Sequence, residues 1–396
     1  MKRTLKVIAL ITALIFAAAA AGCVKRQDDG RDRTAAVDFD GPAHEVSVFF
    51  VNVGKADCAV VTVDSHTWLI DTGTEESFPN MYSALEYLGV RAVDGVILTH
   101  GHADHSGGAA SLALRYPVGV ILWPELLNDP SPIASVIAST GVKGRAVKAG
   151  ESIGIVEGVS FEALAPTTLS RNDNDNSLVL MLRVNGRRFL FTGDMQTEED
   201  GLLTASGADI LCDVLKVPNH GNPDAVSEAF AKAASPLVSV ISTDRSVDKN
   251  SANRTVRAKL TGSEIFLTEG CEIGVLVTVS PRGEISVEIP ERREASARAE
   301  LTAVSKADQS FTVTNGGAEE IDISRWFVWS TKGYEVFSFP EGTRIPAGGS
   351  LTVACKKSSA AADLVWDVKK VWADSKEDVA VLCDRWGNEI SRRASE

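Results

Sequence analysis

The sequence predicts a layered α/β domain followed by a smaller all-β domain in a chain of 396 residues. Between residues 45 and 290, strand-like apolar runs alternate with segments of helical periodicity, a mixture that builds helices onto sheets. Beyond residue 300 the signals become almost purely strand-like, with Gly, Pro, Asn and Ser turns between them. Residues 291–300 are charged and lack an apolar face, so we interpret them as a linker.

The α/β domain is predicted to begin with three strands, in EVSVFFVNV, CAVVTV and TWLIDTG. A helix follows, in which Met81, Leu85 and Leu88 have helical spacing and Gly89 marks the end. VDGVILTH is a further strand, and it leads directly into a loop rich in histidine. Strand and helix signals then alternate as far as a closing hairpin, EIGVLVTVSPRGEISVEI.

The first 23 residues have the pattern of an export signal. Three basic side chains precede residues 7–20, an apolar core that is short for a membrane span. The sequence AAGC that ends at Cys23 resembles a bacterial lipobox, and the alternative is an ordinary secretory signal with an incidental cysteine. Both predict an extracytoplasmic protein, and lipidation of Cys23 predicts an anchor in the cell membrane. Residues 24–44 are polar and mixed in charge, which predicts a flexible tether.

The chain is acidic, with a formal net charge of −13. Residues 45–290 contain 18 basic and 31 acidic side chains, a balance unlike that of a dedicated nucleic-acid module. A local basic groove is compatible with this composition. Five cysteines follow Cys23, and an odd number in an exported protein predicts at least one free thiol. Cys355 and Cys383 could pair within the C-terminal domain, and the other three are expected to be buried hydrophobes.

Three of the six histidines in the chain lie within residues 100–105. The stretch presents His100, His102, Asp104 and His105 directly after an apolar strand. Neutral imidazoles and a carboxylate on a tight loop suit a borderline divalent metal ion. The alternative, a solvated polar loop, does not explain four donor side chains in six positions. The sequence therefore predicts a metal site at this strand end, and His44 and His66 are expected to be surface residues.

The pattern His-x-His-x-Asp-His resembles the signature of the metallo-β-lactamase-fold hydrolases. Three further segments, in the same order, resemble the ComEC-like (competence protein) branch: VNVGKADCAVVTVDSHTWLIDTG, NDNDNSLVLMLRVNGRRFLFTGDM and DVLKVPNHGNPDAVSEAFAKAASPLVSVIS. The resemblance covers about 245 residues. It implies an αββα sandwich with the metal ions at one edge, between the sheets, and a metal-dependent hydrolase activity.

The resemblance also assigns the ligands of two divalent ions, zinc or manganese. His100 and His102 match ligands of the first ion, and Asp194 matches the carboxylate that bridges both ions. The ligands of the second ion match Asp104, His105 and His220. Asp104 and Asp194 are accordingly the expected catalytic carboxylates. Asp57 and Asp71 could contact and orient these ligands without binding the ions, or they could simply accept hydrogen bonds from backbone amides at strand ends.

This chain departs from the family pattern at three positions. No histidine lies between His105 and His220, so the first ion lacks one usual ligand; Asp175 or water could replace it. Oxygen-rich ligation of this kind would tolerate manganese. The ligand in Asn219-His220-Gly221 is assigned to His220, where the branch often has two histidines. Asn52 stands where the branch usually has Asp, and Lys216 could either meet a phosphate or belong to an apolar strand.

The C-terminal region resembles a lamin tail domain, and its candidate motifs extend from FTVTNGG through IDISRW and FSFP to EDVAVLCDRWGNEI. That family implies an immunoglobulin-like β-sandwich over residues 301–396, which acts as a binding or tethering module for a partner that the sequence does not identify. The tryptophans of the region are expected in its core, with a ligand platform as the alternative.

These resemblances imply a lipid-anchored hydrolase that cleaves phosphodiesters in DNA or nucleotides through a hydroxide bridging the metal ions. One alternative is a surface interaction protein in which the sandwich binds a partner and the α/β domain is a scaffold. Another is a hydrolase of different esters or of lactams.

Overall fold

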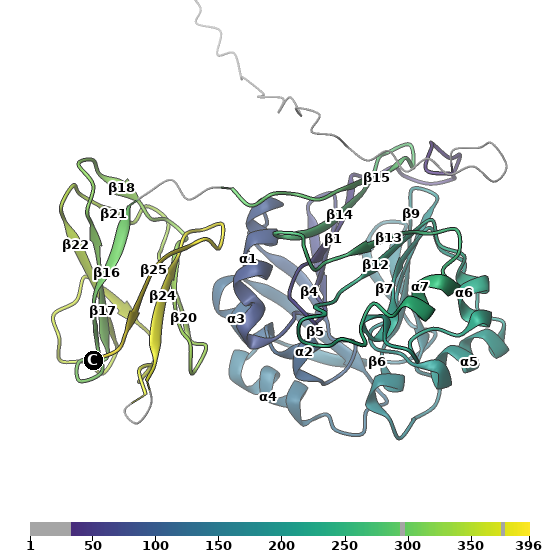
Figure 1. The fold of residues 1–396 in the computed structure, drawn as a ribbon, viewed down its shortest axis with the longest axis horizontal. Helices are drawn as coiled ribbons and strands as arrows, with labels where there is room; N and C mark the ends of the chain where they lie inside the picture. The colour runs from purple at the N-terminus through teal and green to yellow at the C-terminus, as the bar shows by residue number, and fades with distance from the viewer. Residues whose placement is uncertain (1–32, 294–297, 374–376) are drawn as a thin grey trace, which may run out of the picture.

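The computed structural model describes residues 33–293, 298–373 and 377–396 (Figure 1). Two large sheets pack face to face in the first domain, and a small β-sandwich follows it. The export signal, with Cys23 and the first part of the tether, lies outside the described residues. Within the described ranges, every helix is too short or too polar to cross a membrane.

The first sheet has eight strands in the order β15-β14-β1-β2-β3-β4-β5-β6. Their bounds are β1 Val46–Val51, β2 Ala59–Val63, β3 His66–Ile70, β4 Val93–Ile97, β5 Val118–Pro124, β6 Gly144–Val147, β14 Gly274–Val279 and β15 Ile285–Glu288. Strands β3 to β6 run parallel, whereas the other neighbours are antiparallel. The carboxyl ends of β3 and β4 therefore meet at one edge of the sheet.

The second sheet has seven strands in the order β13-β12-β11-β10-β9-β8-β7. Their bounds are β7 Ser152–Val156, β8 Val159–Ala165, β9 Val179–Val184, β10 Arg187–Phe191, β11 Val214–Lys216, β12 Val238–Ile241 and β13 Glu264–Leu267. Strands β10 to β13 are parallel. Each sheet thus contributes a parallel half, and loops that follow parallel strands collect at one edge.

Helices cover the outer side of each sheet (Figure 1). Those beside the first sheet are α1 Phe78–Tyr87, α2 Ala103–Ser106, α3 Ala109–Arg115 and α4 Ser131–Thr140; those beside the second are α5 Thr197–Ser206, α6 Glu228–Ala234 and α7 Arg254–Lys259. Consecutive residues of β1 face opposite layers, because Phe50 joins the core between the sheets and Phe49 packs under α1. The predicted αββα class is confirmed.

The C-terminal domain contains two four-stranded sheets and one two-stranded ribbon. Their strands are β16 Ala299–Ser305, β17 Ser310–Asn315, β22 Ser350–Cys355 and β23 Leu364–Trp366; β19 Phe327–Ser330, β20 Val336–Ser338, β24 Val379–Cys383 and β25 Glu389–Ala394; and β18 Ile321–Asp322 with β21 Arg344–Ile345. Trp326, Trp366 and Trp372 belong to the core of this domain, as the sequence predicts. Trp329 and Trp386 do not: Trp329 packs against the apolar cluster under α1, and Trp386 is half-buried.

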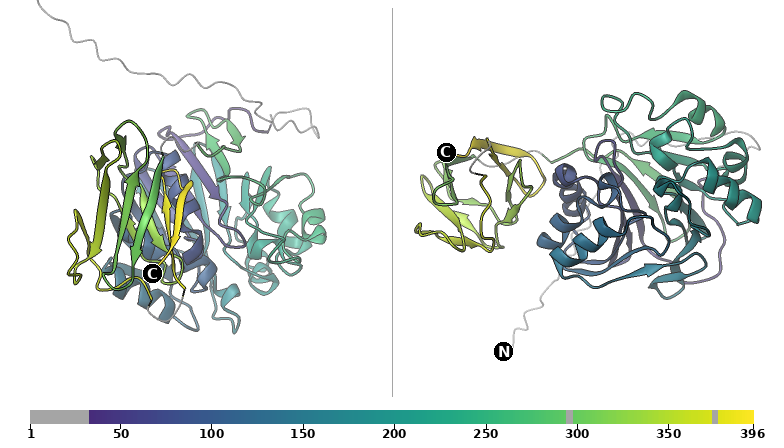
Figure 2. Two further views of the ribbon diagram at one scale, coloured as in Figure 1. Left: turned by 60° about the vertical axis from the view of Figure 1, so that its left-hand side comes forward. Right: turned by 90° about the horizontal axis from the view of Figure 1, so that it is seen from below.

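The central strands β19 and β24 of the sheet β20-β19-β24-β25 are largely buried on both faces. Val328 and Leu382 point into the sandwich core, whereas their neighbours Phe327, Val381 and Cys383 join the apolar cluster under α1 and α3. Figure 2 shows the sandwich lying against these two helices. Because successive strand residues alternate between faces, one sheet serves as the wall of two cores.

Two expectations about the N-terminal segment are wrong for the residues that the structure describes. Residues 33–44 are not a free tether, because the backbone of Val37 donates a hydrogen bond to Arg282 at 3.0 Å. His44 is not a surface residue: it is 8% exposed, and its Nδ1 lies 2.7 Å from Oδ2 of Asp64. Its backbone also pairs with the side chain of Asn185, at 3.0 and 2.7 Å.

Cys355 and Cys383, whose pairing the sequence left open, do not form a disulfide. Both thiols are free and buried. They end strands of different sheets, and Cys355 faces the sandwich core while Cys383 faces the α/β domain. The expectation that Cys58, Cys212 and Cys271 are buried is confirmed.

Candidate metal centre

The histidine loop is held against two neighbouring strand ends by backbone hydrogen bonds. The amide of Thr72, after β3, donates to the carbonyl of His105 at 2.7 Å, and the amide of Asp57, before β2, donates to the carbonyl of Asp104 at 3.0 Å. Gly108 closes the loop so tightly that a Cβ there would lie 2.2 Å from the carbonyl oxygen of Thr72. The short motif therefore depends on contacts with segments distant in sequence.

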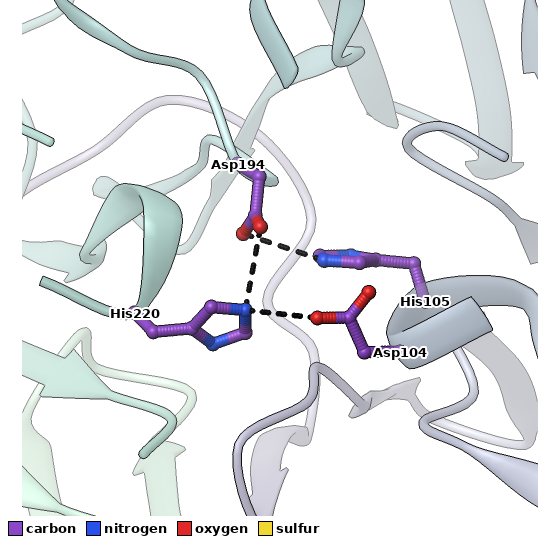
Figure 3. Close-up of side chains that lie close together, drawn as sticks. All are labelled: Asp104, His105, Asp194 and His220. Atoms are coloured by element: carbon purple, nitrogen blue, oxygen red, sulfur yellow. Dashed lines mark ion pairs between the residues drawn. The ribbon is translucent and has the colours of Figure 1, made fainter. Parts of the chain in front are cut away.

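Four side chains converge from three loops, as Figure 3 shows. Asp104 and His105 come from α2, Asp194 follows β10, and His220 lies in the 3-10 turn η3 (Pro218–Gly221) after β11. Nε2 of His105 lies 3.3 Å from Oδ1 of Asp194, and Nε2 of His220 lies 3.3 Å from its Oδ2. Nε2 of His220 also lies 3.4 Å from Oδ2 of Asp104. Asp194 thus stands between the two imidazoles.

The donor atoms of this group fit a divalent cation. One ligand atom from each of Asp104, His105, Asp194 and His220 lies within 4.8 Å of the others. Nε2 of His105, Nε2 of His220 and Oδ1 of Asp194 are buried, and none has a hydrogen-bond partner in the structure. Buried polar atoms are normally satisfied, and a metal ion among these atoms would satisfy all three.

The electrostatics of the cluster match a site for positive charge. Burial opposes protonation of His105, but the carboxylates of Asp194 and Asp71 raise its pKa well above the ordinary value. Burial likewise opposes protonation of His220, yet Asp194 raises its pKa to about 9. Burial raises the pKa of Asp194, and the nearby His220 and His105 lower it well below its usual range. A metal ion would therefore bind in competition with protons.

A carboxylate and a backbone carbonyl beneath the cluster orient its histidines. Oδ2 of Asp71 lies 2.8 Å from Nδ1 of His105, and Asp71 also accepts hydrogen bonds from the backbone and hydroxyl of Thr99, at 2.7 and 2.8 Å. The carbonyl of Ser242 lies 3.0 Å from Nδ1 of His220. Partners on Nδ1 leave Nε2 facing the cluster, the arrangement common to metal-binding histidines.

Backbone strain accompanies this orientation. Asp71, Asn219 and His220 have φ values of 58°, 42° and 51°, in the left-handed region that L-residues with a Cβ rarely adopt. Such conformations persist where the surroundings enforce them, and they gather at functional sites. Here the backbone of His220 accepts a hydrogen bond from Ala252 at 2.8 Å.

His100 and His102 lie beside this group. Nε2 of His100 and Nδ1 of His102 are 2.9 Å apart, and the rings of His100 and His105 have centroids 4.1 Å apart. Burial and the neighbouring His105 lower the pKa of His100 well below its ordinary value, so its imidazole is neutral and its lone pair is available. His102 is exposed, whereas His100 is fully buried.

Three residues singled out in the sequence make contacts outside the cluster. Oδ1 of Asp175 is directed toward the start of α5 and not toward the histidines. It accepts hydrogen bonds from the backbone amides of Gln196 at 2.9 Å and Glu199 at 3.3 Å. Asn52 donates to the carbonyl of Cys271 at 2.7 Å and so fixes a loop. Lys216 is 5% exposed and forms an ion pair with Asp57, which makes it a buried partner of that carboxylate.

The sequence also missed contributors to the site. Thr99, Ser242 and Lys55 contact the predicted ligands or their carboxylate supports. Ser242 contributes a backbone carbonyl, so its side-chain type carries no signal. Lys55 lies in VNVGKADC, part of a segment that resembles the ComEC-like branch, but a single lysine in a loop carries no sequence signal of its own.

Comparisons with known proteins agree with the fold. Residues 51–244 match the family model for the Metallo-beta-lactamase superfamily, and residues 286–395 match that for the Lamin Tail Domain. ComE operon protein 3 of Bacillus subtilis is 28% identical over 220 residues, which cover 50% of this chain and 28% of that protein. Competence protein ComA of Neisseria gonorrhoeae is 29% identical over 206 residues, which cover 51% of this chain and 27% of that protein.

The chain thus spans little more than a quarter of these two curated relatives. Among solved structures, the metallo-beta-lactamase fold protein YhfI from Bacillus subtilis aligns with 59% of this chain and 99% of its own, with 13% identity and a TM-score of 0.43. The predicted enzyme class and the resemblance to competence proteins are confirmed. Residues 51–244 form a domain of the metallo-beta-lactamase superfamily, and residues 286–395 form a lamin tail domain.

Proposed function

We propose that this protein is a phosphodiesterase that uses two divalent ions, zinc or manganese, to cleave DNA or nucleotides outside the cytoplasm. The observation that carries this proposal is the group of unpartnered donor atoms on His105, Asp194 and His220. The choice of phosphodiester substrates is supported by the similarity to the competence proteins. Fold similarity by itself does not determine a substrate.

The charge of the centre favours an anionic substrate group. Asp57, Asp71, Asp104 and Asp194 are opposed by two lysines, and two divalent ions would leave a surplus of about two positive charges if the imidazoles are neutral. A phosphodiester suits that surplus better than an uncharged lactam does. The acidic balance of residues 45–290 disfavours extended contacts with a polyanion, so we expect recognition to be confined to groups near the centre.

The residues of the chain position the reaction. When bound, paired divalent ions activate water and neutralise charge that builds up on a phosphoryl oxygen. His100 and His102 would hold the first ion, and Asp104, His105 and His220 would hold the second, with Asp194 between them. Burial raises the pKa of Asp104, but the nearby His220 and His105 together outweigh burial and lower this pKa, so the carboxylate stays ionised.

The direct test is hydrolysis by the purified soluble part of the protein in the presence of Mn²⁺ or Zn²⁺. Bis(p-nitrophenyl) phosphate, single-stranded DNA and nitrocefin represent the phosphodiester and lactam classes. We expect cleavage of the first two and little of nitrocefin. Cleavage of nitrocefin alone would replace the phosphodiesterase proposal with a lactamase.

The role of Asp194 gives a sharper prediction. Since this carboxylate faces both His105 and His220, Asp194→Ala should abolish hydrolysis and lower the metal content measured by atomic emission. Asp209→Ala is the matched control, because the Asp209 side chain is 63% exposed and pairs with surface arginines. Full activity of Asp194→Ala on a substrate that the parent cleaves would rule out a dinuclear mechanism.

We further propose that the protein is anchored to the cell membrane by lipid on Cys23. The small residues that precede this cysteine at the end of an apolar segment support the proposal. Cys23→Ser should release the protein from the membrane fraction or block its processing. Unchanged fractionation together with unchanged processing would argue against lipidation.

A further inference from the structure

Lys55 places a partly exposed side chain at the solvent-facing edge of the metal centre, here called its mouth. Its Nζ lies 3.4 Å from Oδ2 of Asp104, the same oxygen that lies 3.4 Å from Nε2 of His220. The side chains of Lys55 and Asp104 are each 25% exposed. The ammonium therefore stands between solvent and the predicted ligands of the second ion.

The backbone around Lys55 is fixed from two sides. The neighbouring Asp57 donates its amide to the carbonyl of Asp104 at 3.0 Å and accepts from the amide of Gly73 at 2.7 Å. Ala56 is fully buried. With its base held in this way, the lysine reaches the mouth through a flexible four-carbon stem.

Lys216, the lysine that the sequence suggested for phosphate binding, occupies a different environment. It is buried against Asp57, and its Nζ also donates to the carbonyl of Val217 at 3.0 Å. Its charge is thus neutralised inside the domain. Of these two lysines, Lys55 is the one that solvent and a substrate can reach.

Metal binding would change the balance of charge around Lys55. A cation held by Asp104 and His220 would draw on the carboxylate that Lys55 faces in this structure. The ammonium would then lie beside a positive centre, an arrangement that is favourable when an anion lies between the two. A phosphate oxygen has the charge and the lone pairs to accept hydrogen bonds from the ammonium.

We propose that Lys55 is the anion-binding residue of this centre and contacts a non-bridging phosphate oxygen of the substrate. The inference rests on the proposed phosphodiesterase function and specifies how that function would select a phosphate group. Lys55 recognises the phosphate and does not hold the ions, so its loss should weaken binding of an anionic substrate more than it slows the reaction.

The test compares Lys55→Met and Lys55→Arg with the parent, all loaded with the same metal. Calorimetry with inorganic phosphate should show a Kd about tenfold higher for Lys55→Met, since one charge-assisted hydrogen bond is lost. Lys55→Arg retains the charge and should restore binding to within about threefold. Lys148→Met is the control, because the Lys148 side chain is 65% exposed and pairs with Glu125.

Kinetics supply an independent readout. For bis(p-nitrophenyl) phosphate, Lys55→Met should raise KM by about tenfold and change kcat by less than about threefold. The KM for p-nitrophenyl acetate, which carries no charge, should stay unchanged. An equal loss on both substrates, or an unchanged phosphate Kd with normal metal content, would overturn the role of Lys55.

The outcomes also separate this inference from the proposed function. If the parent protein cleaves the phosphodiester and Lys55→Met has no effect, the proposed function stands and the role of Lys55 is overturned. If the parent protein binds phosphate through Lys55 but cleaves no phosphodiester, the proposed function is overturned and the anion site stands. A parent that binds no phosphate would overturn the inference directly.

Discussion

Asp71 acts on the histidine loop at two points. One oxygen accepts the backbone amide of Thr99 at 2.7 Å, while the other lies 2.8 Å from Nδ1 of His105. The first contact fixes where the loop leaves the strand, and the second fixes the rotation of the imidazole. Asp71 holds these positions from a left-handed backbone conformation, with φ of 58°. A single carboxylate thus couples the course of the loop to the direction of a predicted metal ligand.

We expect Asp71→Asn to lower metal affinity by about 10- to 100-fold while the protein stays folded, because the carboxylate that orients His105 is lost. Competition with a chromogenic chelator measures the affinity, and circular dichroism monitors the fold. Asp94→Asn is the matched control: Asp94 also faces a histidine Nδ1, that of His66 at 3.2 Å, but away from the centre. Equal affinities for the two variants would contradict the orienting role.

At the scale of elements, the start of α5 shows how a loop and a helix share one carboxylate. Oδ1 of Asp175 accepts the backbone amides of Gln196 and Glu199, so it satisfies donors of the first turn that lack partners within the helix. The same helix begins shortly after Asp194. Asp175 therefore influences the centre through the position of a backbone segment.

Glu199 on this turn gives a pH-dependent prediction. Burial, reinforced by Asp175, raises its pKa from 4.5 to about 7. The folded chain then binds more protons than the unfolded chain between these values, so the free energy of unfolding falls as the pH rises through them. Glu199→Gln should stabilise the protein at pH 8 and have little effect at pH 4.5.

Urea unfolding at the two pH values measures this effect. Glu198→Gln is the matched control, because it makes the same change of charge on the same helical turn. A Glu199→Gln variant that is no more stable than its parent at pH 8 would show that the buried carboxyl costs the fold nothing.

At the scale of the whole molecule, a buried acid joins the two domains. The side chain of Glu86 on α1 is fully buried. Nε of Arg325 donates to its Oε1 at 2.6 Å, and Nη2 of Arg385 donates to its Oε2 at 2.8 Å. Burial raises the pKa of Glu86, but these arginines outweigh it and lower that pKa. Aromatic contacts surround the cluster, including Phe78 and Phe327 with ring centroids 6.0 Å apart.

This interface predicts that both domains unfold in one cooperative transition. Glu86→Ala leaves the partly buried Arg325 and Arg385 without their shared anion and should lower the free energy of unfolding by about 3 kcal/mol, or split the transition into two. Calorimetry of the purified soluble part of the protein distinguishes these outcomes from no change. Glu341→Ala is the control, because Glu341 is 67% exposed and lies 3.9 Å from Nε of Arg325. Independent melting of two domains in the parent would contradict the prediction.

The sequence predicts the layers and the histidine loop well because both are local patterns. His100 to His105 lie within one short loop, and strand periodicity needs only a few residues. Asp194 and His220 became candidates through family resemblance, since nothing local marks them as partners of that loop. Lys216 and His44 show the limit. Their partners, Asp57 and Asn185, lie more than a hundred residues away, so no local pattern distinguishes a paired side chain from a free one.

The sheet that contributes side chains to both cores has a consequence for recognition. Because the sheet β20-β19-β24-β25 packs against α1 and α3, the opposite sheet of the sandwich faces away from the α/β domain. A ligand held there would present its neighbouring groups to the centre at a high effective concentration when its length matches the span, and at almost none when it does not. The packing of the two domains would thus set the distance between such a ligand and the centre, and substrates of matching length would be favoured.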